Sequence, residues 1–191
     1  MDQPVLTTKE ALLTHGKRLF WLEGYGNVSV RDITGAAGVD AALVSRYFGG
    51  KLGLFEATLA GMDTLDLSAI PDAEALIDAL VRIFDEAERH SDVPTAISLA
   101  LSNARDPEAG PLVMAQLTAC WTEPMAQLLG SKELAAMVTC VVFGLSVGEK
   151  MLHIEGIHAP GTPEYRAQVE HMLRAALATP TVTVPQGPVN D

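Results

Sequence analysis

Two basic residues, Arg46 and Lys51, stand on either side of a Gly-Gly pair and have side chains suited to phosphates and base edges. The planar guanidinium of Arg46 can donate to guanine O6 and N7 or to a phosphate. Lys51 stands where a helix is predicted to begin, and the helix dipole disfavours a cation at that end. A phosphate held by the ammonium and by the first N–H groups of the helix would offset that cost. The pattern therefore predicts anion binding beside an arginine that reads bases.

The elements that must position these side chains are three short helices in residues 1–50. Two capping boxes, each a hydroxyl residue with an acidic residue three positions later, predict helix starts at Thr7 and Ser29. Asp40 predicts a third start as an N-cap. Glycines predict the ends, so the helices should span about 8–23, 30–37 and 41–48.

The second and third helices are joined by a short turn containing glycine, an arrangement typical of a helix-turn-helix. Any small helical bundle can contain such a turn, and the spacing alone leaves that alternative open. If Val39, Val44 and Phe48 point inward, the rest of the third helix faces outward. The predicted nucleic-acid contacts are Ser29, Ala41, Ala42, Leu43, Ser45, Arg46, Tyr47 and Lys51.

Three of these residues also have a purely structural interpretation. Arg46 can be a solvated surface arginine, and Tyr47 can belong to the core instead of binding a phosphate. Ser29 needs no ligand, because capping the second helix already explains a serine there. Ala41 and Ala42 offer only small apolar side chains, which permit close approach and contact with thymine methyl groups.

A dense and ordered set of motifs runs through residues 19–55. They are Phe20, Gly24-Tyr25, Ser29-Val30-x-Asp32-Ile33, Ala37-Gly38-Val39, Tyr47-Phe48, Lys51 and Leu54-Phe55. In this order and spacing they resemble the amino-terminal DNA-binding domain of TetR-type transcriptional regulators. At two positions the chain departs from that family, with Ser45 where tyrosine is usual and Gly50 where serine is usual.

The resemblance implies an all-α regulator of transcription that has no enzymatic activity and no cofactor. Its implied partners are a palindromic double-stranded DNA operator, a second copy of the chain and a small-molecule effector. The implied organisation is a helix-turn-helix domain in 1–50 and a helical effector-binding and dimerisation domain in 51–178. Residues 179–191, with three prolines and no helical periodicity, are predicted to be a disordered tail.

The charge of the chain is divided unevenly along its length. The 191 residues carry a formal net charge of −11. Residues 1–62 contain six Lys and Arg against six Asp and Glu, so the whole excess of negative charge lies in the remainder. Only the first part can therefore approach a phosphate backbone without strong repulsion.

Composition excludes several other classes of protein. A hydrophobic content of 48% argues against disorder over most of the length. Cys120 and Cys140 have neither disulfide-framework nor zinc-site spacing, which favours a reducing cytoplasm. We expect no signal peptide and no membrane span, because the longest uncharged apolar run, 134–148, has 15 residues.

The predicted helix over 131–153 is apolar nearly all round and must be covered on two sides. One side can be the core of the subunit, and the resemblance implies that the last two helices pair with those of a second subunit. The predicted dimer contacts are Val142, Gly144, Leu145 and Gly148, with the two glycines allowing close approach.

A segment rich in adaptable apolar side chains is a candidate cavity for an apolar effector. An ordinary core would look much the same in sequence, and that alternative stays open. The predicted lining residues are Phe84, Leu101, Met114, Leu117, Thr118, Trp121, Met125 and Phe143.

Other functions are less well supported by the sequence. His153, Glu155 and His158 are metal-capable but fall at a predicted helix end, so we predict no metal site. The leading interpretation is a DNA-binding regulator, with repressor favoured over activator. The alternatives are a helical protein-interaction module that does not bind DNA and, third, an all-α enzyme, against which the lack of a catalytic constellation counts.

Overall fold

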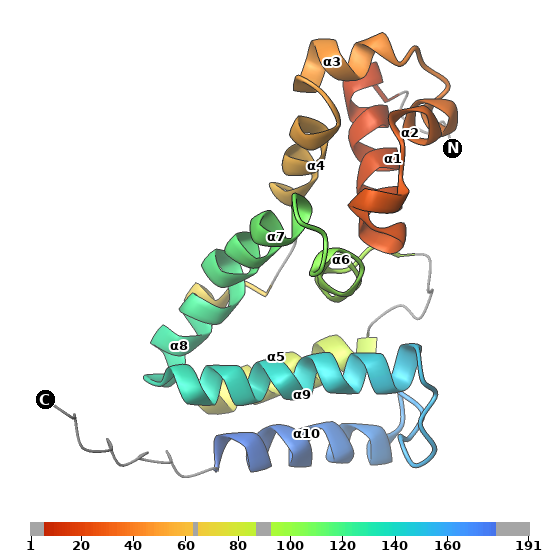
Figure 1. Cartoon of the computed structure of the whole chain (residues 1–191). Coiled ribbons are helices and arrows are strands. Elements are labelled where there is room, and N and C mark those ends of the chain that lie inside the picture. The colour runs from red at the N-terminus through yellow and green to blue at the C-terminus, as the bar shows by residue number, and fades with distance from the viewer. Residues whose placement is uncertain (1–5, 63–64, 87–92, 179–191) are drawn as a thin grey trace, which may run out of the picture. The chain divides into compact units, whose positions relative to one another are not determined.

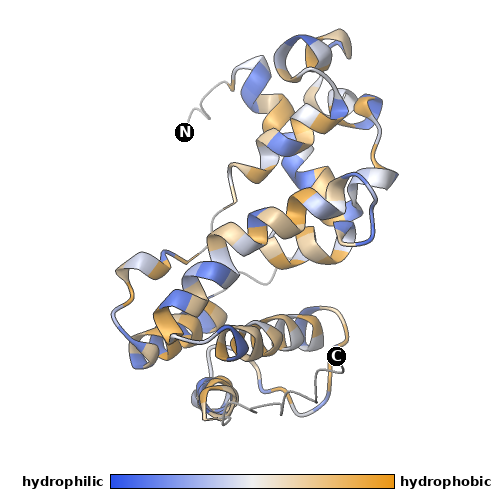
Figure 2. Cartoon of the chain, turned by 60° about the vertical axis from the view of Figure 1, so that its left-hand side comes forward, coloured by the Kyte–Doolittle hydropathy of each residue, from blue (hydrophilic) through white to orange (hydrophobic). Residues whose placement is uncertain are grey.

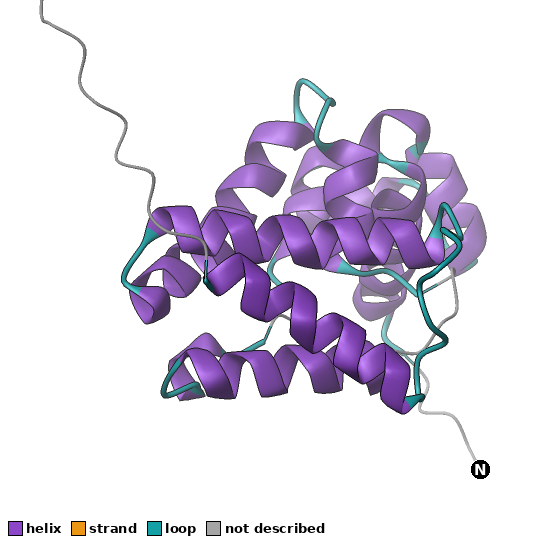
Figure 3. Cartoon of the chain, turned by 90° about the horizontal axis from the view of Figure 1, so that it is seen from below, coloured by secondary structure: helices purple, strands orange, loops and turns teal. Residues whose placement is uncertain are grey.

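The computed structural model describes residues 6–62, 65–86 and 93–178. These residues form helices joined by loops, with no strand among them (Figures 1 and 3). The predicted all-α fold is therefore confirmed. The predicted tail, 179–191, lies outside the described residues.

The described residues pack as two compact units, one within 1–65 and 88–121 and the other within 66–87 and 122–191. This division by packing differs from the functional domains predicted from the sequence, 1–50 and 51–178, which stay a prediction. The helices of the first unit are α1 (Thr8–Glu23), α2 (Val30–Ala37), α3 (Ala42–Phe48), α4 (Lys51–Leu59), α6 (Ala96–Asn103) and α7 (Ala109–Leu117). Those of the second are α5 (Ala73–Glu86), α8 (Glu123–Leu129), α9 (Lys132–Lys150) and α10 (Pro163–Leu177).

The first two of the predicted helix starts are confirmed. Both capping boxes form, at Thr7 for α1 and at Ser29 for α2. The third start is one residue later than predicted: the N-cap of α3 is Ala41 and not Asp40, although the Asp40 carboxylate still accepts the N–H of Ala42 at 2.7 Å. Gly38, with φ of 67°, ends α2 in the left-handed conformation and opens the turn to α3.

Helix α4 is shorter than its apolar pattern predicts. The sequence predicts a helix reaching almost to Pro71, but α4 ends at Leu59. Gly61 follows soon after the end of the helix. Its carbonyl oxygen accepts a hydrogen bond of 2.7 Å from the Lys17 ammonium of α1, so this carbonyl is paired with a side chain and not with a helical N–H. The apolar pattern also predicts Leu52 on the buried stripe with Phe55 and Leu59, but Leu52 is half-buried, and Leu54 is fully buried instead.

The core of the first unit is built around three aromatic rings. Phe20 of α1, Tyr25 of the 3-10 turn Tyr25–Asn27 and Phe55 of α4 have ring centroids 5.2 to 5.6 Å apart. Asn103, at the end of α6, is fully buried beside them. Its side-chain amide donates to the carbonyl of Phe20 at 3.0 Å and accepts the N–H of Tyr25 at 2.7 Å. The end of α6 is thereby fastened to the end of α1.

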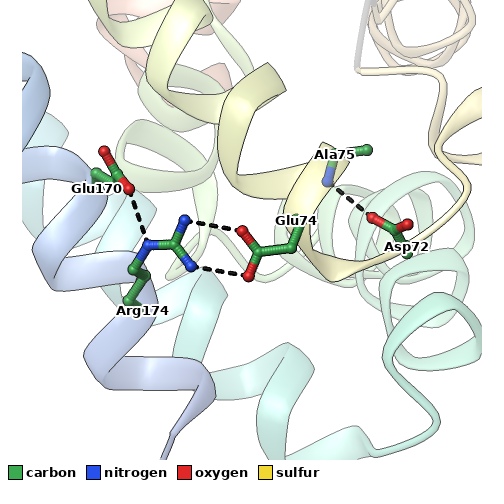
Figure 4. Close-up of polar contacts among 5 residues, drawn as sticks. All are labelled: Asp72, Glu74, Ala75, Glu170 and Arg174. Atoms are coloured by element: carbon green, nitrogen blue, oxygen red, sulfur yellow. Dashed lines mark hydrogen bonds and ion pairs between the residues drawn. The ribbon is translucent and has the colours of Figure 1, made fainter.

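In the second unit, α10 lies antiparallel to α5 and is held by an ion pair at each end. Arg174 forms two hydrogen bonds of 2.8 Å to Glu74 and one to Glu170 (Figure 4). At the other end Asp85, which the sequence places on the solvent face, has a side chain only 7% exposed and pairs with Arg166. Paired charges at both ends fix the register of the two helices.

Helix α9 covers the second unit with one face and exposes another. Val138, Val142 and Leu145 are buried, whereas Met137 is 41% exposed and Cys140 is exposed. Figure 2 shows hydrophobic residues, in orange, interspersed with hydrophilic ones along these helices. Among the described residues, no helix is long and apolar enough to span a membrane.

Candidate nucleic-acid interface

The outward face of α3 is the face that the sequence predicts. Val44 is 1% exposed and anchors the helix on the core. Ser45 and Arg46 are exposed, and Leu43 is half-buried at the edge of the face. Ala41 and Ala42, at the start of the helix, are exposed as well. The start of this face therefore carries the small side chains of Ala41, Ala42 and Ser45 beside the long side chain of Arg46.

Arg46 and Tyr47 extend from this face toward solvent. Tyr47 is 40% exposed, so it is not a core residue, and its ring lies edge-on to that of Phe48 with centroids 6.3 Å apart. The guanidinium carbon of Arg46 is 6.0 Å from the centroid of the Tyr47 ring. Within the described part of the chain, Arg46 has no ion-pair or hydrogen-bond partner. Its donors are free for a ligand.

Ser29 has the capping role, and its hydroxyl is already engaged there. The hydroxyl donates to Asp32 Oδ2 at 2.7 Å and accepts the N–H of Asp32 at 3.2 Å. The hydrogen bonds that the Ser29 hydroxyl and the Ser29 backbone N–H donate to the Asp32 carboxylate lower the pKa of that carboxyl. A DNA contact from Ser29 stays a prediction, and it would need the hydroxyl to serve two partners.

Lys51 opens α4 as predicted, but the chain itself supplies a partner for its charge. The ammonium nitrogen lies 4.0 Å from the centroid of the Tyr25 ring. The negative face of an aromatic ring attracts a cation at this distance. Gly50 provides no side-chain cap, so the first N–H groups of α4 are not covered from that side. Lys51 is half-buried, with the ring behind it.

The turn between α3 and α4 depends on glycine. Gly49 and Gly50 have φ of 76° and 134°, values that other residues rarely adopt. A Cβ on Gly53, in the first turn of α4, would lie 1.9 Å from the carbonyl oxygen of Phe48. The end of α3 thus abuts the backbone of α4, which fixes the position of Arg46 relative to Lys51.

Sequence reasoning missed one cation at this face. Lys9, in the first turn of α1, places its ammonium 5.8 Å from the centroid of the Phe48 ring at the end of α3. Lys9 is exposed, and it adds a third basic side chain near α3. The sequence does indicate Lys9, because the helix dipole disfavours a cation in the first turn of a helix, as it does for Lys51.

The predicted effector-pocket residues come from both packing units, and the pocket stays a prediction. Phe84, Leu117 and Met125 are buried, Trp121 and Phe143 are half-buried, and Leu101, Met114 and Thr118 are exposed. Between α7 and α8 the chain forms a π-helical turn, Thr118–Thr122, which includes Trp121. A proline lacks the N–H that a helix interior needs, so Pro124 predicts a kink or a helix end here, and it stands in the first turn of α8.

The four predicted dimer contacts divide into interior and surface residues. Val142 and Leu145 are 8% and 2% exposed, so they already pack within the subunit. Gly148 is buried too, and a Cβ there would lie 3.1 Å from Ile157, in the chain's own loop after α9. Only Gly144 is exposed, and a Cβ there would meet nothing within 4 Å.

Comparisons with known proteins match the segment of the chain that carries the candidate interface. Residues 12–58 match the family model of bacterial regulatory proteins, tetR family. This match contains α2, the turn, α3 and most of α4. No curated protein matches the chain in sequence.

In the described residues, no group of three or more His, Cys, Asp or Glu side chains is arranged to hold a metal ion.

Solved structures show the same fold over most of the chain. NalD, described as the secondary repressor of the MexAB-OprM multidrug efflux pump in Pseudomonas aeruginosa, has a TM-score of 0.65 at 18% identity, over 88% of this chain and 94% of NalD. A TetR-family transcriptional regulator from Streptomyces coelicolor has a TM-score of 0.60 at 16% identity, over 89% of this chain and 94% of that one. A transcriptional regulator from a Rhodococcus species has a TM-score of 0.58 at 22% identity, over 90% and 94%.

Proposed function

We propose that this chain, whose residues 12–58 match the family model of bacterial regulatory proteins, tetR family, is a DNA-binding regulator of transcription that acts as a homodimeric repressor in the cytoplasm. Each subunit inserts α3 into the major groove of one half of a palindromic operator. The observation that carries this proposal is the exposed face of α3, where Arg46 extends from small neighbours and has its donors free.

The residues of the interface divide into two roles. Arg46 reads a base edge, and Ala41 and Ala42 approach the thymine methyl groups. Lys51 and Lys9 bind phosphates, which set the position of the helix but carry no sequence information. Because residues 1–62 have as many acidic as basic side chains, each subunit neutralises few phosphates. Non-specific binding is therefore weak, and affinity depends strongly on the few cations present.

The proposal is tested by selecting binding sites from randomised duplex DNA with the full chain. A regulator of this type should enrich a palindrome whose half-sites lie one helical turn apart. An electrophoretic shift on the DNA that flanks its own gene is the second arm. If neither arm yields a preferred sequence at physiological salt, the helix-turn-helix is a protein-interaction module and the proposal is wrong.

Arg46→Ala and Lys51→Ala should weaken DNA binding in different ways. The loss of Arg46 should cost about 1–3 kcal/mol per half-site and relax the preference at one base position. The loss of Lys51 should lower affinity for all sequences alike and reduce the salt dependence by about one ion per subunit. Competition binding against a randomised operator measures both. If Arg46→Ala keeps the parental affinity for DNA and the parental base preference, the face of α3 that is proposed to contact the bases is wrong.

We propose that the dimer forms through the exposed faces of α9 and α10. Because Val142 and Leu145 are buried in the subunit, substitutions there would unfold it, and Gly144 is the better probe. Gly144→Glu should give monomers. A Cβ at this position of α9 meets nothing in the subunit, and the glutamate would place a negative charge in the proposed dimer interface. Gln127→Glu, on the exposed surface of α8, should leave the dimer intact. Sedimentation at micromolar concentration decides, and a monomeric parent protein would contradict the proposal.

The proposed effector is a small, largely apolar molecule bound near Trp121. Two features support it: Trp121 lies in a π-helical turn, a structure that is frequent at functional sites, and the apolar residues Leu101 of α6 and Met114 of α7 are 47% and 51% exposed. A compound that releases DNA should weaken binding by about 5- to 150-fold. Trp121→Ala should lower the affinity for that compound without changing DNA binding in its absence. Equal compound affinity in both proteins would place the effector elsewhere.

A further inference from the structure

Tyr25 is fixed by contacts to three other elements of the first unit. Its N–H donates to Asn103 Oδ1 of α6 at 2.7 Å. Its hydroxyl interacts with the side chain of Glu108, the residue before α7. Its ring packs against Phe20 and Phe55 with centroids 5.6 and 5.2 Å away. With 6% of its surface exposed, Tyr25 has almost no freedom to turn.

The Lys51 ammonium lies against this immobile ring. It is 4.0 Å from the ring centroid, well within the range of a cation–π contact. A lysine side chain has four rotatable bonds, and in open solvent it would sample many positions. The ring restricts that sampling and holds the charge at the first turn of α4. The Asp32 carboxylate also interacts electrostatically with Lys51.

We infer that Tyr25 is a positioning residue for DNA binding, which places the Lys51 ammonium where a phosphate is bound. The inference rests on the proposed role of Lys51 as a phosphate contact. Tyr25 itself need not touch DNA, since it acts through the lysine. The same contacts tie the phosphate site to α6 and to the start of α7, which lie outside the helix-turn-helix.

The ionisation of Tyr25 is consistent with this arrangement. Burial, followed by the hydrogen bond to Glu108 and the charges of Glu108 and Asp106, raises the pKa of Tyr25 to about 12. The phenol is therefore protonated at neutral pH, and its O–H group faces the negative charge of Glu108 as a neutral dipole. A neutral ring with its hydroxyl anchored presents a constant face to Lys51.

A double-mutant cycle on DNA binding tests the inference. The duplex that the parent protein selects best is titrated with full-length variants. The single variants are Tyr25→Leu, Tyr25→Phe, Lys51→Ala and Arg46→Ala. The double variants combine each Tyr25 substitution with Lys51→Ala or with Arg46→Ala. Tyr25→Leu should lower affinity about threefold to tenfold and reduce the salt dependence, because the ring face is gone. Adding Lys51→Ala should produce no further loss beyond that of Lys51→Ala alone. Adding Arg46→Ala should multiply the two losses.

The outcomes separate the inference from the function on which it rests. If the losses of Tyr25→Leu and Lys51→Ala multiply, Tyr25 does not position the lysine, and the inference is overturned while Lys51 remains a phosphate contact. If Lys51→Ala keeps parental affinity and salt dependence, both ideas fall. Should Tyr25→Leu lose helical circular dichroism, Tyr25→Phe decides. This variant keeps the ring and loses only the contact with Glu108. We expect it to bind DNA at most about twofold more weakly than the parent protein. In the Lys51→Ala background, Tyr25→Phe should cause no further loss of affinity.

Discussion

Gly53→Ala is expected to impair both the stability of the protein and its binding to DNA. The added Cβ would lie 1.9 Å from the Phe48 carbonyl oxygen, so α3 and α4 must move apart. Overpacking of this kind costs about 1–3 kcal/mol, more than the gain of about 1 kcal/mol that alanine brings to a helix. Because Arg46 and Lys51 stand on opposite sides of this junction, operator affinity should fall about tenfold or more. Chemical unfolding and operator titration measure the two effects.

Gly35→Ala is the matched control for this substitution. Gly35 is also a helical glycine, in α2, and a Cβ there would meet nothing within 4 Å. We expect the free energy of unfolding to rise by about 0.5–1 kcal/mol, the usual effect of this change in an exposed helix. A Gly53→Ala protein as stable as Gly35→Ala, with full operator affinity, would mean that the junction tolerates a wider spacing.

Asn103→Ala should be the most destabilising of the polar substitutions proposed for this chain. It removes three buried hydrogen bonds, to Phe20, Tyr25 and Leu99. The Tyr25 N–H would then be left buried without its acceptor. One unsatisfied buried donor costs about 1–3 kcal/mol, and the cavity left by the side chain adds to it. We expect a loss of about 2–4 kcal/mol in the free energy of unfolding, measured in urea.

Asn27→Ala provides the comparison. Asn27 is exposed, and its amide makes one hydrogen bond, to the Glu23 carbonyl at 2.8 Å. Water can replace that bond, so the cost should stay below about 1 kcal/mol. Equal losses at the two positions would indicate that water reaches the site of Asn103 and satisfies the Tyr25 N–H.

The contacts that could be predicted from the sequence are the local ones. The Thr7 and Ser29 capping boxes pair residues three apart, so each signal is complete within one turn of chain. The outward face of α3 was predictable too, since one buried position, Val44, sets the orientation of a seven-residue helix. Together these signals were enough for the fold of the DNA-binding domain and most of its candidate surface.

The contacts that could not be predicted join residues far apart in the chain. Asn103 and Tyr25 are 78 positions apart, and Asp85 and Arg166 are 81 apart. An aspartate at the edge of an amphipathic helix has the pattern of a solvent residue until its arginine partner is known. The long apolar stripe after Lys51 likewise predicts a continuous helix. The hydrogen bond from the Lys17 ammonium to the Gly61 carbonyl cannot be read from the residues around Gly61, because its two partners are 44 positions apart.

The closeness of Lys9 to Phe48 has a practical consequence for handling the protein. The first turn of α1 lies beside the end of α3, so a segment fused directly ahead of Thr8 would start next to the proposed DNA-binding surface. A polyhistidine tag or a fluorescent protein attached there would crowd the duplex, and an acidic linker would repel it. A carboxyl-terminal fusion follows α10, which contributes no residue to that surface. Affinities measured with amino-terminal fusions should therefore be read as lower limits until the tag has been cleaved.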